Sequence, residues 1–251
     1  MYCNSCQCLS RCNNYHHYFH FCQFHPIIKD MLNALIKDDR YLLENEVNER
    51  SQTHKLAEHL QYLLPKWNID CEYNKKLTDP KTLDFNRIIQ SIITIIETKH
   101  IIGDDEIRKV FKALQKALKE SVKIADEGDV DNETDSADSK FSFLQFTTSK
   151  GEKYIKKVFP DIIAHIRGTM ENRIVIEAKR AGNRNQKARW FDLIKLALFT
   201  ECKGEYAYDV GYFIDIPKSI PDKFFVNFER NKTLQQIIPC SNVWMVTIQK
   251  I

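Results

Sequence analysis

Several features that mark other classes of protein are missing from this sequence of 251 residues. No hydrophobic run is long enough to span a membrane, because the longest, from Ile88 to Ile96, is interrupted by Gln90 and Ser91. The first residues show no secretory signal. The formal net charge is only +3, which argues against a strong field over the whole surface of the kind that attracts nucleic acid or membranes. We therefore expect a globular, cytoplasmic protein without membrane partners.

Cysteine is distributed unevenly, because five of the eight cysteines lie in the first 22 residues. Without a secretory signal, a disulfide framework is not expected. Two Cys/His pairs in this segment resemble the halves of a zinc site: Cys3 with Cys6, and Cys22 with His25. The alternative interpretation is a disordered extension. We predict that residues 1–30 form a Cys/His-rich extension of one of these two kinds, and that the folded domain covers residues 31–251.

The rest of the chain predicts an α/β fold. A stripe of leucines at helical spacing indicates a helix over residues 39–64, which Pro65 ends. A second helix is predicted over residues 185–202. Alternating or buried patterns predict strands over residues 68–74, 156–166, 174–179, 206–216 and 243–251. The third of these strands follows the second after a turn containing Gly168, so we expect an antiparallel hairpin.

A long insertion, about residues 75–150, separates the first two of these strands. It predicts two helices, over residues 83–100 and 104–125. An acidic segment with little apolar content follows at residues 126–139 and is interpreted as a flexible loop. Residues 141–146 predict a short strand.

Two carboxylates interrupt the apolar faces of the predicted hairpin. Because alternate residues of a strand share a face, Asp161 lies on the face of Ile163, and Glu177 on the face of Val175 and Lys179. Two buried carboxylates side by side would repel each other, and a divalent cation between them removes this cost. Oxygen ligands favour a hard ion such as Mg²⁺ or Mn²⁺. The alternative is an exposed hairpin whose acids pair with the lysine in solvent.

A metal ion beside Lys179 suits phosphodiester hydrolysis. A metal activates water for attack on phosphorus, and an adjacent cation stabilises the negative charge that develops there. Glu49 lies on an extension of the apolar stripe of the first predicted helix. Its spacing alone leaves two interpretations open, a buried acid bound to a cation and a solvated residue beyond the packed zone.

Pro160-Asp161, fifteen intervening residues and then Glu177-Ala178-Lys179 resemble the motif of the PD-(D/E)XK, or restriction-endonuclease-like, nuclease superfamily. The predicted order of elements is similar to the αβββαβ core of that superfamily, with a central mixed sheet flanked by helices. Residues 39–217 also resemble a group of uncharacterised bacterial proteins within it. The resemblance implies that Asp161, Glu177 and the Ala178 carbonyl bind metal and that Lys179 is the catalytic lysine. It further implies that the acid at Glu49 completes the metal site.

Basic residues gather around this motif. They are Lys153, Lys156, Lys157, Arg167, Arg173, Lys179, Arg180, Arg184, Lys187 and Arg189. Such a local patch is what binding to a phosphate backbone requires, although a solvated basic face is the plainer alternative. We expect Arg180, Arg184, Gln186 and Lys187 to contact nucleic acid. Asp192 and Lys195, three residues apart in the second predicted helix, are expected to form a structural pair.

The leading hypothesis is a Mg²⁺-dependent endonuclease that acts on nucleic acid, most simply DNA, in restriction, phage defence, repair or a mobile element. The first alternative is a nuclease-like fold that binds nucleic acid or protein without catalysis. The second is a zinc-stabilised protein whose N-terminal Cys/His cluster is the functional part. Because many proteins of the superfamily are dimers, a homodimer is a further expectation; the sequence does not identify an interface.

Overall fold

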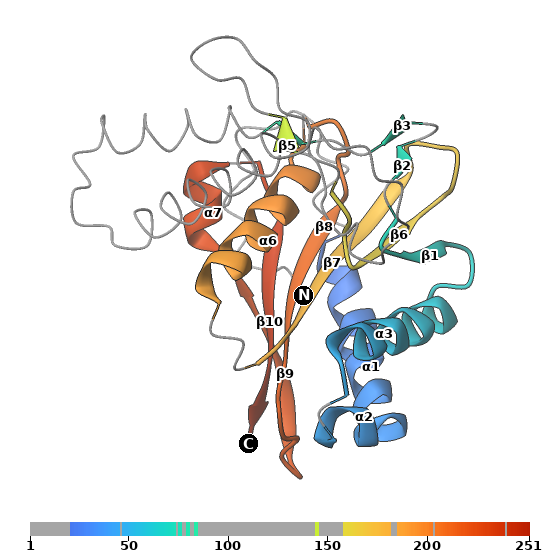
Figure 1. Cartoon of the computed structure of the whole chain (residues 1–251), viewed down its shortest axis with the longest axis vertical. Coiled ribbons are helices and arrows are strands. Elements are labelled where there is room, and N and C mark those ends of the chain that lie inside the picture. The colour runs from blue at the N-terminus through green and yellow to red at the C-terminus, as the bar shows by residue number, and fades with distance from the viewer. Residues whose placement is uncertain are drawn as a thin grey trace, which may run out of the picture.

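A computed structural model describes residues 21–45, 47–73, 75–76, 79–80, 83–84, 144–145, 158–181, 185–202, 204–238 and 240–251. Within these residues a six-stranded mixed sheet lies between two layers of helices (Figure 1). The strands in spatial order are β1 (Asn68–Cys71), β6 (Ile162–His165), β7 (Asn172–Arg180), β8 (Val210–Ile216), β10 (Val243–Lys250) and β9 (Phe224–Arg230). This confirms the predicted α/β class.

The helices divide between the two faces of the sheet. One face is covered by α1 (Phe21–Asp38), α2 (Arg40–Glu44) and α3 (Glu49–Leu63), and the other by α6 (Gln186–Phe199) and α7 (Lys232–Ile237). Each interface is a separate hydrophobic core. Ile163 and Val175 face α6, whereas Ile162 and Ile176 face α1 and α3. The alternation predicted from the sequence is therefore correct for β6 and β7.

The topology brings several strand ends to one edge of the sheet. Strands β1, β6 and β7 form an antiparallel meander, and β7 and β8 are parallel with α6 between them in sequence. The start of β6 therefore lies beside the ends of β7 and β8. At the opposite end, β6 and β7 are joined by a turn in which Gly168 has a φ of 75°, a conformation that glycine adopts without strain. The predicted hairpin is confirmed.

Helix α1 was not predicted, and it crosses the expected domain boundary at residue 31. Its residues Phe24, Ile28, Met31 and Leu35 are buried in the same core as the sheet. Their spacing is that of an apolar helical stripe, which the many cysteines and histidines of this segment obscured. Residues 21–30 therefore belong to the same folded unit as the sheet, and the expected division at residue 31 needs correction.

The helix expected over residues 39–64 is two helices. Asn48 caps α3, because its side-chain oxygen accepts a hydrogen bond of 2.8 Å from the backbone N–H of Ser51. Asparagine at this position favours the start of a helix. Glu49 is therefore the first residue of α3 instead of an interior residue of a longer helix. This position aims its carboxylate at the sheet edge.

Some other predicted bounds also change. The strand expected from residue 156 begins at Ile162, after Pro160, and the strand expected to reach residue 74 ends at Cys71, because Glu72 has a φ of 50°. The strand expected over residues 206–216 begins at Val210. Helix α6 and strand β10 confirm the predictions for those segments. Strand β9 and helix α7 were not predicted.

Little of the insertion lies within the described residues. Leu83 and Asp84, expected to begin a helix, instead form β4 (Leu83–Asp84), which pairs in parallel with β5 (Leu144–Gln145). The short strand predicted over residues 141–146 is thus present in part. Strands β2 (Lys75–Lys76) and β3 (Asp79–Pro80) form a second small ladder. The remaining part of the first predicted helix, the second one and the acidic loop lie outside the described residues.

Among the helices that the structure describes, none is both long and apolar enough to cross a membrane.

Candidate functional site

The residues of the predicted motif meet at the sheet edge. Asp161 immediately precedes β6, and Glu177, Ala178 and Lys179 lie near the end of β7. The backbone N–H of Ala178 donates a hydrogen bond of 2.9 Å to Asp161 Oδ2, which fixes the aspartate against the neighbouring strand. Asp161 keeps 24% of its side chain exposed. The antiparallel register thus produces the proximity that the hairpin pattern predicted.

Lys179 is surrounded by carboxylates from three elements. Its Nζ lies 3.0 Å from Glu49 Oε1, 3.7 Å from Asp161 Oδ2 and 3.5 Å from Asp192 Oδ2. Burial alone would lower the pKa of Lys179, but the negative charges around it raise that pKa overall. Lys179 is therefore a fixed positive charge at the centre of the site. Its contact with Glu49 favours the interpretation in which this acid belongs to the site.

Glu49 is held from two sides. Besides its contact with Lys179, it accepts a hydrogen bond of 3.3 Å at Oε2 from the backbone N–H of Arg180. Both partners lie at the end of β7, so Glu49 connects the first turn of α3 to the strand that carries the motif. Its side chain is 36% exposed, which leaves part of the carboxylate open to solvent.

Glu177 is the most deeply buried acid of the site. Its side chain is 1% exposed, and Oε1 lies 2.8 Å from Lys195 Nζ. This contact is an ion pair, because neither Oε1 nor Oε2 has a hydrogen-bond partner of good geometry among the described residues. Burial raises the pKa of Glu177 well above its ordinary value, and the charges of Asp161 and Asp192 raise it further, against the opposing effect of Lys195. Burial likewise raises the pKa of Asp161, although Lys179 and Lys195 oppose this.

Two residues of α6 belong to the site although the sequence suggested only a structural pair. Lys195 Nζ does lie 3.1 Å from Asp192 Oδ1, as expected for such a pair. However, Lys195 also contacts Glu177, and Asp192 also contacts Lys179. A signal was present in the sequence: both charged residues flank Leu193 and Ile194 in a helix that is otherwise apolar there, and all four are buried.

Charge balance indicates what the site could bind. It contains the carboxylates of Glu49, Asp161, Glu177 and Asp192 against the ammonium groups of Lys179 and Lys195. Oxygen donors of this kind suit a hard divalent cation, and the unpartnered Oε2 of Glu177 is a buried oxygen that such an ion would satisfy. In the part of the chain that the structure describes, no three acidic, histidine or cysteine side chains are arranged to hold a metal. The donors match Mg²⁺ or Mn²⁺ in chemical type and burial, but their arrangement here is one in which Lys179 and Lys195 neutralise them.

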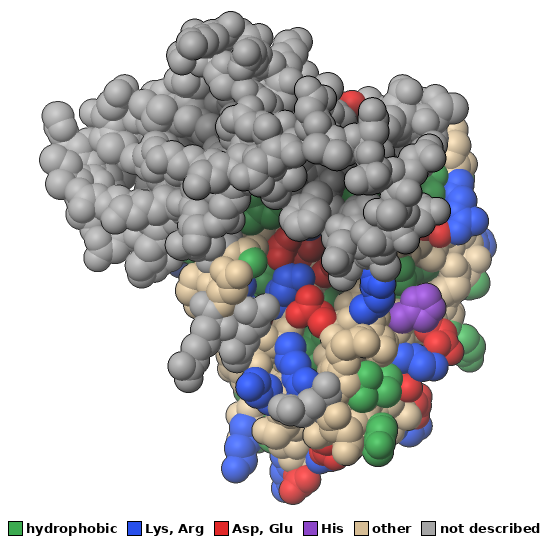
Figure 2. Space-filling model, viewed as in Figure 1, with side chains coloured by type: hydrophobic (Ala, Val, Ile, Leu, Met, Phe, Trp, Pro, Cys, Tyr) green, Lys and Arg blue, Asp and Glu red, His purple; other side chains and the backbone are tan. Residues whose placement is uncertain are grey.

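Three arginines of the basic patch expected around the motif form ion pairs with carboxylates of the described part of the chain. Arg167 pairs with Asp70, Arg173 with Asp209 at 2.8 Å, and Arg189 with Asp215 at 2.6 Å and 2.7 Å. Figure 2 shows acidic and basic side chains interspersed on the described part of this face instead of a surface of one sign. For these three arginines, internal carboxylates neutralise part of the charge that the sequence counted towards a phosphate-binding surface, and binding of nucleic acid stays a prediction.

Of the four residues expected to contact nucleic acid, the structure describes the side chains of Arg180 and Gln186. Arg180 lies half-buried, and its side chain donates to the carbonyl of Leu43 at 3.4 Å. Gln186 is exposed at the first residue of α6. Arg184, the side chain of Lys187, and the basic residues Lys153, Lys156 and Lys157 lie outside the described part of the chain. These contacts stay predictions.

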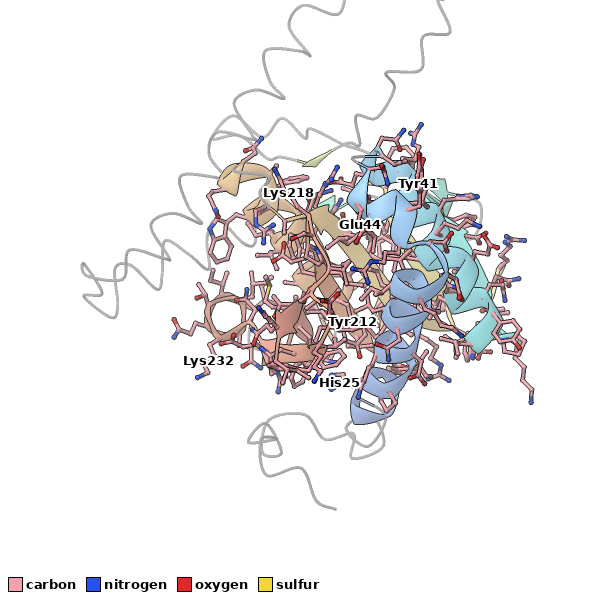
Figure 3. All side chains as sticks on the ribbon, turned by 90° about the horizontal axis from the view of Figure 1, so that it is seen from below. His25, Tyr41, Glu44, Tyr212, Lys218 and Lys232 are labelled. Carbon is pink, nitrogen blue, oxygen red and sulfur yellow. The ribbon has the colours of Figure 1, made fainter. Side chains whose placement is uncertain are left out.

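His25, one of the four predicted zinc ligands, lies in an aromatic cluster. Its ring stacks on Phe228 with a centroid distance of 4.3 Å and meets the edge of Trp244 at 4.5 Å. Figure 3 shows it beside Tyr212, between the start of α1 and the sheet. Burial lowers the pKa of His25 to about 4. The structure thus gives this ring a packing role.

Cys3, Cys6 and the side chain of Cys22 lie outside the described residues. Zinc binding by the N-terminal segment stays a prediction.

Neither the family models, nor the curated proteins, nor the solved structures gave a match to this chain.

Proposed function

We propose that the protein is a metal-dependent endonuclease that hydrolyses phosphodiester bonds, with DNA as its substrate. One observation carries the proposal: the acids and the lysine of the motif converge with Glu49 from a separate helix. Lys179 Nζ lies within 3.0 Å of Glu49 and 3.7 Å of Asp161, while Asp161 is bonded to the backbone beside Glu177. An incidental match to a short motif gives no reason to expect a distant acid on the lysine.

The arrangement of elements supports the resemblance to the PD-(D/E)XK superfamily. Setting aside the short ladders of the insertion, α3, β1, β6, β7, α6 and β8 follow one another in the order helix, three strands, helix, strand. The site lies where the parallel strands β7 and β8 end, the edge at which α/β sheets commonly bind ligands. Helix α1, strands β9 and β10, and helix α7 are additions to this order.

The residues of the chain can be given roles in this reaction. Asp161 and Glu177, with the Ala178 carbonyl and Glu49, would hold a magnesium or manganese ion. Such an ion supplies Lewis-acid activation of water and of the phosphate. Lys179 Nζ donates hydrogen bonds to the attacking water or to a phosphate oxygen, where it stabilises developing negative charge. Glu49 positions that ammonium group, and the backbone of Ala178 orients Asp161.

A binding module without catalysis is the second candidate, and a specific observation favours it. Lys179 and Lys195 already neutralise the carboxylates at 2.8–3.7 Å, so the described site is satisfied largely by its own side chains. Such a site could persist in a protein that has lost turnover. The two candidates differ in whether a divalent cation enters the site and allows cleavage.

The direct test is cleavage of single-stranded DNA, double-stranded DNA and RNA in Mg²⁺, in Mn²⁺ and in EDTA. The wild type is compared with Glu177→Ala and with the control Glu171→Ala. Glu171 is exposed and precedes β7, roughly 20 Å along the strand from Glu177. We expect metal-dependent cleavage that Glu177→Ala abolishes and Glu171→Ala preserves. Absence of cleavage on every substrate, from wild-type protein that is folded, would favour the binding module.

A further inference from the structure

Lys195 links the two segments that carry the motif carboxylates. From α6, its Nζ lies 2.8 Å from Glu177 Oε1 on β7 and donates a hydrogen bond of 3.3 Å to the carbonyl of Phe159. Phe159 is two residues before Asp161, in the segment that leads into β6. One buried ammonium group therefore fixes both the side chain of Glu177 and the chain segment that leads to Asp161. Its side chain is only 8% exposed, so it cannot reach a bound nucleic acid directly.

Asp192 extends this link to the motif lysine. Its two oxygens face different lysines, with Oδ1 3.1 Å from Lys195 Nζ and Oδ2 3.5 Å from Lys179 Nζ. Asp192 and Lys195 are one helical turn apart on the buried face of α6, so the packing of that helix sets the position of both side chains. Through these contacts, α6 determines where the positive charges of the site lie.

We propose that Lys195, held by Asp192, is a positioning residue that supplies the counter-charge for Glu177 and keeps the site assembled without a divalent cation. The proposal rests on the proposed function in one respect, because it assumes that the cation binds at Glu177. A buried carboxylate without a partner is strongly unfavourable, so this role requires a cation at that place. In its absence a divalent ion is expected to become necessary for the stability of the site.

Ordinary packing offers a plainer account, in which the long side chain of Lys195 only fills space in the core. The two accounts differ in their dependence on Glu177. If Lys195 acts through charge, its removal is harmful only while a carboxylate occupies position 177. If it acts through packing, its removal is equally harmful with a neutral residue at position 177. A double-mutant cycle separates these cases.

The experiment measures thermal unfolding of the full chain as wild type, Lys195→Met, Glu177→Gln and the double variant, each in EDTA and in Mg²⁺. Methionine keeps the length of the lysine without its charge, and glutamine keeps the shape of the glutamate. We expect Lys195→Met to lower the midpoint in EDTA by about 10 °C, and Mg²⁺ to recover much of this loss. In the Glu177→Gln background, the same change should cost far less and Mg²⁺ should recover nothing.

A second measurement keeps the test independent of folding yield. In the cleavage reaction with saturating Mg²⁺, we expect Lys195→Met to lower kcat by about 10- to 100-fold with KM for DNA unchanged, as for residues that orient metal ligands. Lys195→Arg should recover part of the loss by restoring the charge. A rise in KM with unchanged kcat would contradict a positioning role.

The outcomes distinguish this inference from the proposed function. An equal cost of Lys195→Met in both backgrounds would overturn it, because the residue would then act by packing. If the cost depends on Glu177 but Mg²⁺ raises the midpoint of no variant, the counter-charge role stands and the metal-dependent function fails. If Lys195→Met and Glu177→Gln do not fold well enough for a midpoint, the comparison of wild type with Lys195→Arg decides. A kcat within about 10-fold of wild type at unchanged KM would support positioning by charge, whereas a larger loss of kcat or a rise in KM would oppose it.

Discussion

The ammonium group of Lys179 lies 3.0 Å from the carboxylate of Glu49, a residue 130 positions earlier in the chain. This contact joins the first turn of α3 to the end of β7. It depends on the cap at Asn48, which starts α3 at the residue that must reach the strand. The site is therefore assembled from both helical layers, with Glu49 from one side of the sheet and Asp192 and Lys195 from the other.

The Glu49 carboxylate should matter for turnover more than for folding. We expect Glu49→Gln to lower the rate of cleavage by about 10- to 100-fold, because Lys179 loses the partner that positions it. The free energy of unfolding should change little, since this side chain is partly exposed. The measurement is cleavage of DNA under the conditions of the direct test, with Glu44→Gln on α2 as control. Full activity of Glu49→Gln would remove this residue from the site.

The charge of Lys179 should be needed in the transition state. We expect Lys179→Gln to lower kcat by at least about 10²-fold, while the affinity for DNA, measured in Ca²⁺ or EDTA, stays within a few-fold of wild type. Lys218→Gln, which changes an exposed lysine after β8, is the matched control. A parallel loss of binding and cleavage would indicate instead that Lys179 serves as a general contact for phosphate.

The burial of His25 predicts a loss of stability in acid. Its folded pKa of about 4 lies below the ordinary histidine value of 6.5, so the unfolded chain takes up a proton that the folded ring resists. The contribution is present above about pH 6.5 and is lost as the pH falls towards 4, with a slope of up to about 1.4 kcal/mol per pH unit.

The variant His25→Phe should show a weaker decline of stability over this range, because phenylalanine preserves an aromatic ring against Phe228 without the titration. Denaturant unfolding at pH 7.5, 6, 5 and 4.5 measures it, with the exposed His54→Phe as control. Identical pH profiles for wild type and His25→Phe would show that the ring is accessible to protons in the folded state.

Helix α1 should be essential to the core. Ile28 is completely buried between this helix and the sheet, so Ile28→Ala should lower the free energy of unfolding by about 2–5 kcal/mol. The neighbouring exposed residue gives the control Lys29→Ala, for which a change below about 0.5 kcal/mol is expected. Chemical denaturation provides both values. Near-equal effects would restore the original interpretation, in which the folded domain begins at residue 31.

Local patterns in the sequence were sufficient to predict the hairpin of β6 and β7 and the helix α6. Strand parity placed Glu177 and Lys179 on the face of Val175, and the apolar stripe of residues 190–198 placed α6 against the sheet. These inferences succeeded because they concern neighbours along the chain, whose relative positions follow from the geometry of one element. The motif residues could be identified for the same reason.

Contacts between side chains of different helices and strands could not be predicted from such local patterns. Asp192 and Lys195 are equally consistent with a pair on a helix surface, and only the docking of α6 on β7 brings them to Glu177 and Lys179. Internal acids also engage Arg173 and Arg189, which the sequence suggested as part of a basic patch. Charge counted along a sequence does not distinguish a free cation from a paired one, because the partner lies on another element.

Strands β1 and β6 are direct neighbours in the sheet, with Cys71 opposite Ile162, although residues 72–161 separate them in the chain. The chain thus leaves the sheet and returns to it at adjacent points, and within this segment the pairing of β4 with β5 holds Leu83 beside Leu144. The entropy of closing such a loop grows only slowly, by about 0.6 kcal/mol for each doubling of its length. Evolution, or a protein engineer, can therefore change the number of residues between β4 and β5 at little cost to the sheet.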